Sequence, residues 1–281
     1  MADIYYSPAK LNLFLEVLGK REDGFHDIET LFCRISLYDI LEISIKKNAR
    51  FSISVDMQGF ALPQEDNICY KAAKLFFERA NINDVSVEIK ISKNIPMQAG
   101  LGGGSSNAAV VLMALNKELP VFSEQELLDM GAQLGSDVPF FLLDCTLAIG
   151  RGRGEILEKA DIDFSMPFFI VCPPISLSTK EIYSSLKLTN QRRDVNIFLA
   201  ALKQGGELEF YNRLYEPAIE YDNRLREEMD IAESIFASKA YLTGSGSAFF
   251  FPYKEYGESV LRRLAKKAGR RGWKGFAVEP V

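Results

Sequence analysis

The chain has 281 residues, a length that predicts about two domains, each large enough to bury a core. Hydrophobic residues make up 47% and charged residues 25% of the chain, which excludes a disordered, fibrous or low-complexity protein. The 33 basic and 38 acidic residues give a net charge of −5, which argues against general coating of nucleic acid. Any polyanion must therefore be bound by a local cluster of groups.

The numbers of cysteine and histidine residues restrict the redox and metal chemistry. The chain has one histidine, and its four cysteines are far apart without a Cys-x-x-Cys pair, so neither a disulfide framework nor a zinc site is indicated. The longest apolar runs are too short to span a bilayer, and Asp3 lies where an export signal would carry basic and apolar residues. We therefore expect a cytoplasmic protein with no membrane partner and no nucleic-acid partner.

The pattern of the first hundred residues predicts strands followed by a helix. Apolar and polar positions alternate over 11–17 and again over 41–45, which is the period of half-buried strands. The spacing becomes helical over 66–80, with Asp66 as the expected N-cap, and strand alternation returns over 85–91.

The middle of the chain is predicted to be helical. Residues 105–115 are rich in Ala, Val, Leu and Met, which is typical of a buried helix. Ser123 is followed three residues later by Glu126, a pattern that predicts a capping box at the start of the next helix. Glycines and arginines alternate over 150–154 and predict a tight turn between two short strands.

A change of composition near 155–165 places the domain boundary there, so we predict domains at 1–160 and 161–281. Both are expected to mix α and β structure. In the second domain we predict strands over 167–174, 240–243, 248–251 and 273–278, and helices over 178–186, 195–202, 223–236 and 254–268.

A glycine-rich loop separates the strand over 85–91 from the helix over 105–115. Its glycines permit positive φ and let backbone N–H groups approach an anion, and the helix that follows adds its own unsatisfied N–H donors. Ser105 and Ser106 offer hydroxyls to phosphate or to a phosphate-bound Mg²⁺. The segment is neither a Walker loop nor a Gly-x-Gly-x-x-Gly loop, and the alternative is a flexible turn with no ligand.

Two charged residues stand in apolar surroundings. Lys10 lies on a predicted strand that should be at least half buried, where an ammonium needs an anionic partner or ligand. The alternative is a lysine at a strand edge that reaches solvent. Asp137 is followed directly by apolar residues and could act as a catalytic base or as the N-cap of a short helix, and the two roles are compatible.

Two further segments have more than one interpretation. Phe25 and the single histidine, His26, lie at the tip of a predicted hairpin, where they could stack on and read a nucleobase, although a lone histidine is more often structural. The second glycine-rich stretch, 243–248, is either a left-handed turn between strands or a backbone support for a phosphate site.

These segments together resemble a known family. The stretch 96–109 resembles the central signature of the GHMP kinases, and 243–248 resembles their third motif. The run Gly-Gly-Gly-Ser-Ser-Asn-Ala-Ala over 102–109, the hairpin Gly-Phe-His over 24–26 and the segment Gly-Ser-Asp-Val-Pro-Phe-Phe over 135–141 resemble the branch that phosphorylates 4-diphosphocytidyl-2-C-methyl-D-erythritol. Phe25 replaces a common tyrosine of that branch, and Gln98 replaces a usual small residue.

The resemblance implies an α+β fold of two domains, the first like ribosomal protein S5 and the second ferredoxin-like, with the active site between them. It implies transfer of the γ-phosphoryl group of ATP, with Mg²⁺, to the 2-hydroxyl of the cytidine substrate in the non-mevalonate route to isoprenoid precursors. A small-molecule kinase of this kind is expected to be a monomer or a weak homodimer.

The resemblance also implies a role for individual residues. Asp137 matches the catalytic base and Lys10 its partner beside the accepting hydroxyl. The substrate contacts are expected to come from Asn12, Phe25, His26, Thr179 and Tyr183. ATP is expected to contact Asn67 and the loop residues Pro96, Met97, Gln98, Ala99, Gly100, Leu101, Gly102, Gly103, Gly104, Ser105 and Ser106.

Two alternatives stay open. The chain could be a GHMP kinase for another small alcohol, which a requirement for a cytidine-containing substrate would distinguish. An S5-like first domain could also belong to an RNA-binding module without catalysis, although the acidic charge and the presence of both Lys10 and Asp137 argue against this.

Overall fold

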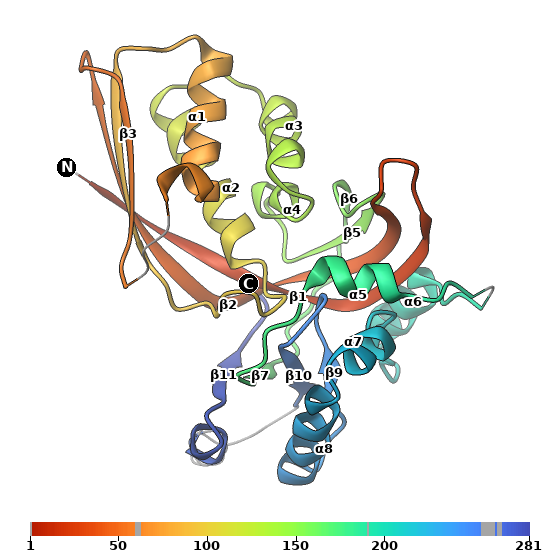
Figure 1. Ribbon diagram of the computed structural model, residues 1–281. Helices are drawn as coiled ribbons and strands as arrows, with labels where there is room; N and C mark the ends of the chain where they lie inside the picture. Colours follow the sequence, from red (N-terminus) through yellow and green to blue (C-terminus); the bar gives the residue numbers. More distant parts are fainter. Residues whose placement is uncertain (1, 60–62, 190, 254–261, 263–265) are drawn as a thin grey trace. The chain divides into compact units, whose positions relative to one another are not determined.

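The computed structural model describes residues 2–59, 63–189, 191–253, 262 and 266–281, which form two compact units (Figure 1). The first unit comprises Met1–Ala9, Leu37–Ile95 and Gly102–Asp144, and the second comprises Lys10–Ser36, Pro96–Leu101 and Cys145–Val281. The units interleave along the sequence because the long strands β1 (Asp3–Lys20) and β2 (His26–Lys47) contribute to both. The contiguous domains at 1–160 and 161–281 are a different division and stay a prediction.

The sheet of the first unit is built on the second half of β2. This half pairs antiparallel with β4 (Val85–Ser92), and β4 pairs parallel with β3 (Ser52–Met57). Every second side chain of β4 is buried, as the alternation in the sequence predicts: Val85, Val87, Ile89 and Ile91.

Four helices pack together in the first unit (Figure 1). They are α1 (Ile68–Ala80), α2 (Gly103–Glu118), α3 (Glu124–Leu134) and α4 (Val138–Leu142). The capping box predicted at Ser123 and Glu126 is confirmed, since each side chain accepts a hydrogen bond from the backbone N–H of the other residue.

The predicted N-cap at Asp66 is wrong. Asp66 ends a short 3₁₀ turn, Gln64–Asp66, and the next residue, Asn67, caps α1 by accepting the Cys69 N–H on Oδ1 at 2.9 Å. The helix α2 begins at Gly103, two residues before the predicted start at Ser105.

The second unit contains the other strands of the seven-stranded sheet to which β2, β3 and β4 belong. The first half of β2 pairs antiparallel with β5 (Leu147–Arg151), which forms a hairpin with β6 (Ile156–Lys159). The tight turn predicted over 150–154 is present, but it lies at 152–155 because Gly150 and Arg151 belong to β5. On the other side, β1 pairs parallel with the two-residue strand β8 (Tyr211–Asn212).

The described residues of the second unit also contain a four-stranded antiparallel sheet and the helices α5 to α8, together with helical residues at 266–270. The strand order is β11 (Lys274–Val278), β7 (Phe168–Cys172), β10 (Phe249–Pro252) and β9 (Tyr241–Leu242). The helices are α5 (Thr179–Ser185), α6 (Val195–Gln204), α7 (Tyr215–Tyr221) and α8 (Arg224–Phe236). The helix predicted over 254–268 lies largely outside the described residues.

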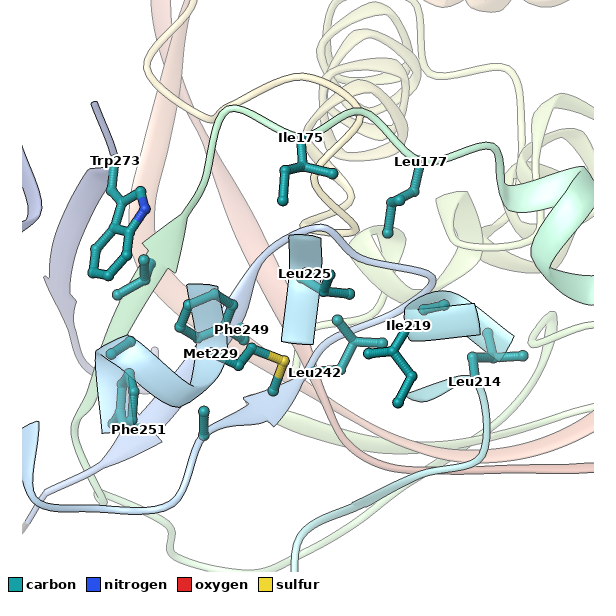
Figure 2. Close-up of a cluster of buried hydrophobic side chains, with 14 of the residues drawn as sticks. Ile175, Leu177, Leu214, Ile219, Leu225, Met229, Leu242, Phe249, Phe251 and Trp273 are labelled. Atoms are coloured by element: carbon teal, nitrogen blue, oxygen red, sulfur yellow. The ribbon is translucent and has the colours of Figure 1, made fainter. Parts of the chain in front are cut away.

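The core of the second unit joins this sheet to its helices (Figure 2). Buried side chains of the sheet, such as Leu242, Phe249 and Phe251, meet Leu225 and Met229 of α8. The expected α+β class is confirmed by these mixed elements. No helix in the described part of the chain is long and apolar enough to cross a membrane.

Candidate active site

The glycine-rich loop carries three residues in the left-handed region. Gly100 has φ +78° and Gly102 has φ +71°, and Gly102 is the N-cap of α2. Gln98 also has a positive φ of 55°, which L side chains rarely adopt, and this explains why a glycine suits the position. Its side-chain Oε1 accepts a hydrogen bond from Ser176 Oγ at 3.0 Å.

The two glycine-rich segments lie against each other. A Cβ at Gly100 would lie 2.4 Å from the carbonyl oxygen of Thr243, and a Cβ at Gly244 would lie 3.0 Å from the carbonyl oxygen of Gly100. Ala248 N–H donates to the carbonyl oxygen of Ala99 at 3.2 Å. The left-handed turn expected over 243–248 is confirmed by the positive φ of Gly244 and Gly246. The segment also contacts residues 99–100 of the loop, and its part in a phosphate site stays a prediction.

A buried ion pair lies beneath the start of α2. Asp39 is fully buried, pairs with the Lys93 ammonium and accepts the N–H groups of Asn94 and Ile95 at 2.8 and 2.9 Å. A Cβ at Gly103 would lie 2.9 Å from Ile95 Cγ2 and 3.2 Å from Lys93 Nζ. Packing within the protein therefore requires glycine at 103.

The first turn of α2 presents backbone N–H groups and two hydroxyls. A helix N-terminus carries unsatisfied N–H donors and a partial positive charge, which favour an anion. Ser105 is partly exposed, whereas Ser106 is fully buried and its Oγ accepts the Ser7 hydroxyl at 2.7 Å. The Gly104 backbone is exposed, and a Cβ there would meet only Ile68 Cγ2, at an ordinary 3.8 Å.

Lys10 is buried at 3% exposure, so the alternative of a lysine reaching solvent is wrong. Its Nζ donates to Asn12 Oδ1 at 2.6 Å and lies 5.5 Å from the centroid of the Phe32 ring. The Asn12 side chain in turn donates from Nδ2 to Thr30 Oγ1 at 2.8 Å, and its backbone N–H donates to Thr243 Oγ1 at 2.9 Å. Lys10 and Asn12 are thus held in one buried polar network.

The predicted base-reading residues lie at the turn between β1 and β2. Phe25 is half exposed, and the guanidinium of Arg153 lies 4.8 Å from the centroid of its ring. His26 is partly buried beside Tyr183, with ring centroids 5.1 Å apart. Burial and, to a lesser extent, the charge of Lys20 lower the pKa of His26 below its usual value, so its neutral form is favoured.

The helix α5 brings Thr179 and Tyr183 to one face, one turn apart. Thr179 Oγ1 and Ser245 Oγ share a hydrogen bond of 2.7 Å, so the helix start is tied to the second glycine-rich stretch. The second unit therefore contains Lys10, Asn12, Phe25, His26, Thr179, Tyr183 and loop residues 96–101.

The first unit contains the other predicted site residues, Asn67, Asp137 and loop residues 102–106. Asp137 occupies the N-cap position of α4 and is partly buried, but its side chain makes no capping hydrogen bond. The capping alternative therefore does not account for its carboxylate. Among the described residues, no group of three or more His, Cys, Asp or Glu side chains is placed to hold a metal ion.

Sequence reasoning missed two residues of these networks. Thr30 sits in the run Thr-Leu-Phe-Cys over 30–33, where a hydroxyl among apolar neighbours was a weak signal. Arg153 lies in the Gly-Arg-Gly-Arg-Gly turn, which indicated only a turn, and no pattern placed it beside Phe25.

Comparison with known proteins identifies the family. Residues 67–144 match the family model of the GHMP kinases N terminal domain. A Syntrophotalea carbinolica protein named 4-diphosphocytidyl-2-C-methyl-D-erythritol kinase is 37% identical over 281 residues, which cover 99% of this chain and 98% of that protein. The chain belongs to the 4-diphosphocytidyl-2-C-methyl-D-erythritol kinase family. A Francisella tularensis protein of the same name is 38% identical over 95% of this chain and 92% of its own length.

Solved structures agree with this family. A crystal structure of a 4-(cytidine 5'-diphospho)-2C-methyl-D-erythritol kinase is 33% identical, with a TM-score of 0.83 over 99% of this chain and 100% of that one. A mevalonate kinase is only 17% identical, with a TM-score of 0.66, and shows the fold alone. The GHMP kinase resemblance and its α+β architecture are therefore confirmed.

Proposed function

We propose that the protein transfers the γ-phosphoryl group of ATP to the 2-hydroxyl of 4-diphosphocytidyl-2-C-methyl-D-erythritol, a step of the non-mevalonate route to isoprenoid precursors. The observation that carries the proposal is the match to this kinase family over nearly the whole of both chains. The buried Lys10 and the loop with positive φ at Gly100 and Gly102 support it, because both suit a site for a polyanion.

The reaction exchanges one P–O bond for another. The substrate hydroxyl oxygen forms a bond to the γ-phosphorus, the bond from that phosphorus to the oxygen bridging to the β-phosphate breaks, and ADP leaves. The proton of the hydroxyl passes to the Asp137 carboxylate, the proposed general base. The Lys10 ammonium stabilises the negative charge that develops on the hydroxyl and the transferring group.

The nucleotide is assigned to the loop 96–106 and to Asn67. The N–H groups in the first turn of α2 donate to phosphate oxygens. Since the Asn67 Oδ1 already accepts the Cys69 N–H, the amide NH₂ of Asn67 is the group that would contact the adenine.

The cytidine substrate is assigned to residues of the second unit. Phe25 offers a ring for stacking, and His26, neutral at physiological pH, offers one donor and one acceptor to the base edge. Asn12, Thr179 and Tyr183 supply further polar contacts. Because Arg153 lies over one face of Phe25, the base would stack on the other face.

A divalent cation fits this set of residues only if the nucleotide supplies most of its ligands. Mg²⁺ is typically bound by one or two protein groups, waters and substrate phosphates, and the Ser105 and Ser106 hydroxyls are the candidates here. When bound, Mg²⁺ would neutralise charge on the β- and γ-phosphates.

A direct test follows phosphorus. The protein is mixed with ATP, Mg²⁺ and the cytidine substrate, and ³¹P NMR is expected to show a new phosphomonoester together with one equivalent of ADP. Mevalonate and homoserine serve as controls and are expected to remain unphosphorylated. Turnover of either control at the rate of the cytidine substrate would contradict the assignment.

Two expectations about the protein's setting are proposals of the same kind. None of the four cysteines, all in the described part of the chain, forms a disulfide, and three of them are buried, which suits the reducing cytoplasm. A monomer or weak homodimer is expected, and sedimentation at micromolar concentration measures it.

A further inference from the structure

Thr30 closes a chain of hydrogen bonds that ends at the Lys10 ammonium. Its hydroxyl donates to the carbonyl oxygen of Phe14 at 2.6 Å, and the same Oγ1 accepts Asn12 Nδ2 at 2.8 Å. Asn12 Oδ1 then accepts Lys10 Nζ at 2.6 Å. Lys10 and Asn12 are each 3% exposed and Thr30 is fully buried, so protein partners rather than bulk water satisfy these groups.

The direction of each bond follows from the direction of the first. A carbonyl oxygen only accepts, so the single Thr30 proton is used on Phe14 and Oγ1 can only accept from Asn12. The side of the Asn12 amide that faces Thr30 must therefore be NH₂, which leaves the amide oxygen facing Lys10. Donor and acceptor assignments of an amide rest on such partners.

Removing the Thr30 hydroxyl would remove this preference on one side of the amide. The buried Asn12 Nδ2 would lose its acceptor, and rotation of the amide toward another acceptor would take Oδ1 away from Lys10 Nζ. The backbone around Lys10 is fixed separately, because its N–H donates to the carbonyl oxygen of Leu101 at 2.9 Å. The Lys10 backbone therefore has an anchor that does not depend on the Thr30 hydroxyl.

We propose that Thr30 is a positioning residue for phosphoryl transfer, which orients the Asn12 amide and, through it, the Lys10 ammonium. This inference rests on the proposed role of Lys10 in the reaction. The orientation of the Asn12 and Lys10 side chains by Thr30 can also be measured without any substrate.

The kinetic test compares Thr30→Val, which replaces the hydroxyl by a methyl group of similar size, with Thr30→Ser, which keeps it. We expect Thr30→Val to lower kcat about tenfold with little change in KM for ATP, on the usual worth of a buried hydrogen bond. Thr30→Ser is expected to stay within about twofold of the wild type. If Thr30→Val fails to fold, Thr30→Ala removes the same hydroxyl without adding a methyl group beside Asn12.

A double-mutant cycle separates positioning from a merely structural role. If Thr30 acts through Lys10, Thr30→Val lowers kcat much less in a Lys10→Met background than in the wild type. An equal factor in both backgrounds would overturn the proposal. The cycle compares ratios of kcat, so it can be run with whichever alcohol the wild type phosphorylates. Failure of the proposed substrate would therefore appear in the wild type and is distinguishable from failure of the role of Thr30.

A crystal structure of Thr30→Val provides the readout that is independent of activity. We expect Lys10 Nζ to leave hydrogen-bond distance of Asn12 Oδ1 while the strand path is kept. Retention of that hydrogen bond in the variant would overturn the proposal even if kcat falls.

Discussion

Three of the glycines near the start of α2, Gly100, Gly103 and Gly104, differ in what surrounds them, and Gly104→Ala tests the difference. A Cβ at Gly100 or Gly103 would lie under 3.0 Å from protein atoms, whereas at Gly104 its nearest neighbour is 3.8 Å away. Gly104 is also inside α2, where alanine is favoured over glycine by about 0.5–1 kcal/mol. Nothing in the protein itself therefore requires glycine at 104.

We expect Gly104→Ala to raise stability and to weaken nucleotide binding. The helical preference corresponds to a rise of about 1–4 °C in Tm for a chain of this size. If a phosphate lies against the exposed Gly104 backbone, the added methyl group prevents its close approach, and a misfit worth about 1–3 kcal/mol raises KM for ATP about 5- to 150-fold.

Thermal unfolding without ligand and steady-state kinetics with varied ATP measure the two effects. Gly100→Ala is the matched control, because its Cβ would meet the Thr243 carbonyl oxygen at 2.4 Å and its φ is +78°, so this variant should lose stability. A stabilised Gly104→Ala with unchanged KM for ATP would refute the placement of phosphate at this turn.

Three other predictions concern single side chains. Asp137→Asn should lower kcat about 10²-fold or more with an unchanged Tm, and a near wild-type kcat would exclude a general base at this position. Phe25→Ala should raise KM for the cytidine substrate about tenfold but not KM for ATP, whereas Phe25→Tyr should be nearly neutral; a shift in KM for ATP instead would mean that the pockets are exchanged. The pKa of His26 is lower in the folded state than in the unfolded state, so the folded state binds fewer protons. The contribution of His26 to stability is therefore present above its unfolded pKa and is lost as pH falls through its folded pKa. Denaturant unfolding at pH 7.5 and 5 should show a smaller loss in His26→Gln than in the wild type, and equal losses would contradict it.

The sequence predicted the elements whose pattern is local. The alternation over 11–17 predicted a half-buried strand; the strand is present, but every residue of 11–17 is buried. Ser123 with Glu126 predicted the helix start that the structure contains. The N-cap of α1 was predicted one residue too early. Asp66 belongs to a 3₁₀ turn, and Asn67 is the N-cap. Propensity over a few residues does not register such a turn.

Other features depend on contacts distant in sequence. The run of Ala, Val, Leu and Met placed the start of α2 at Ser105, but the helix includes Gly103, whose lack of a Cβ allows it to pack on Ile95 and Lys93. The strand β8 has only two residues, too few for a period of two to be visible. The Arg153 contact with Phe25 joins two turns that the sequence separates widely.

The position of Lys10 depends on segments that are widely spaced in the sequence. The Lys10 N–H is held by Leu101 of the first glycine-rich segment, and the Asn12 N–H by Thr243 of the second. The side chain of Asn12 is held by Thr30. Each of these partners comes from a different part of the chain, so no single segment could fix the lysine. In the proposed mechanism, the second glycine-rich stretch acts as a support for Lys10 and Gly100, and this role needs no contact to phosphate.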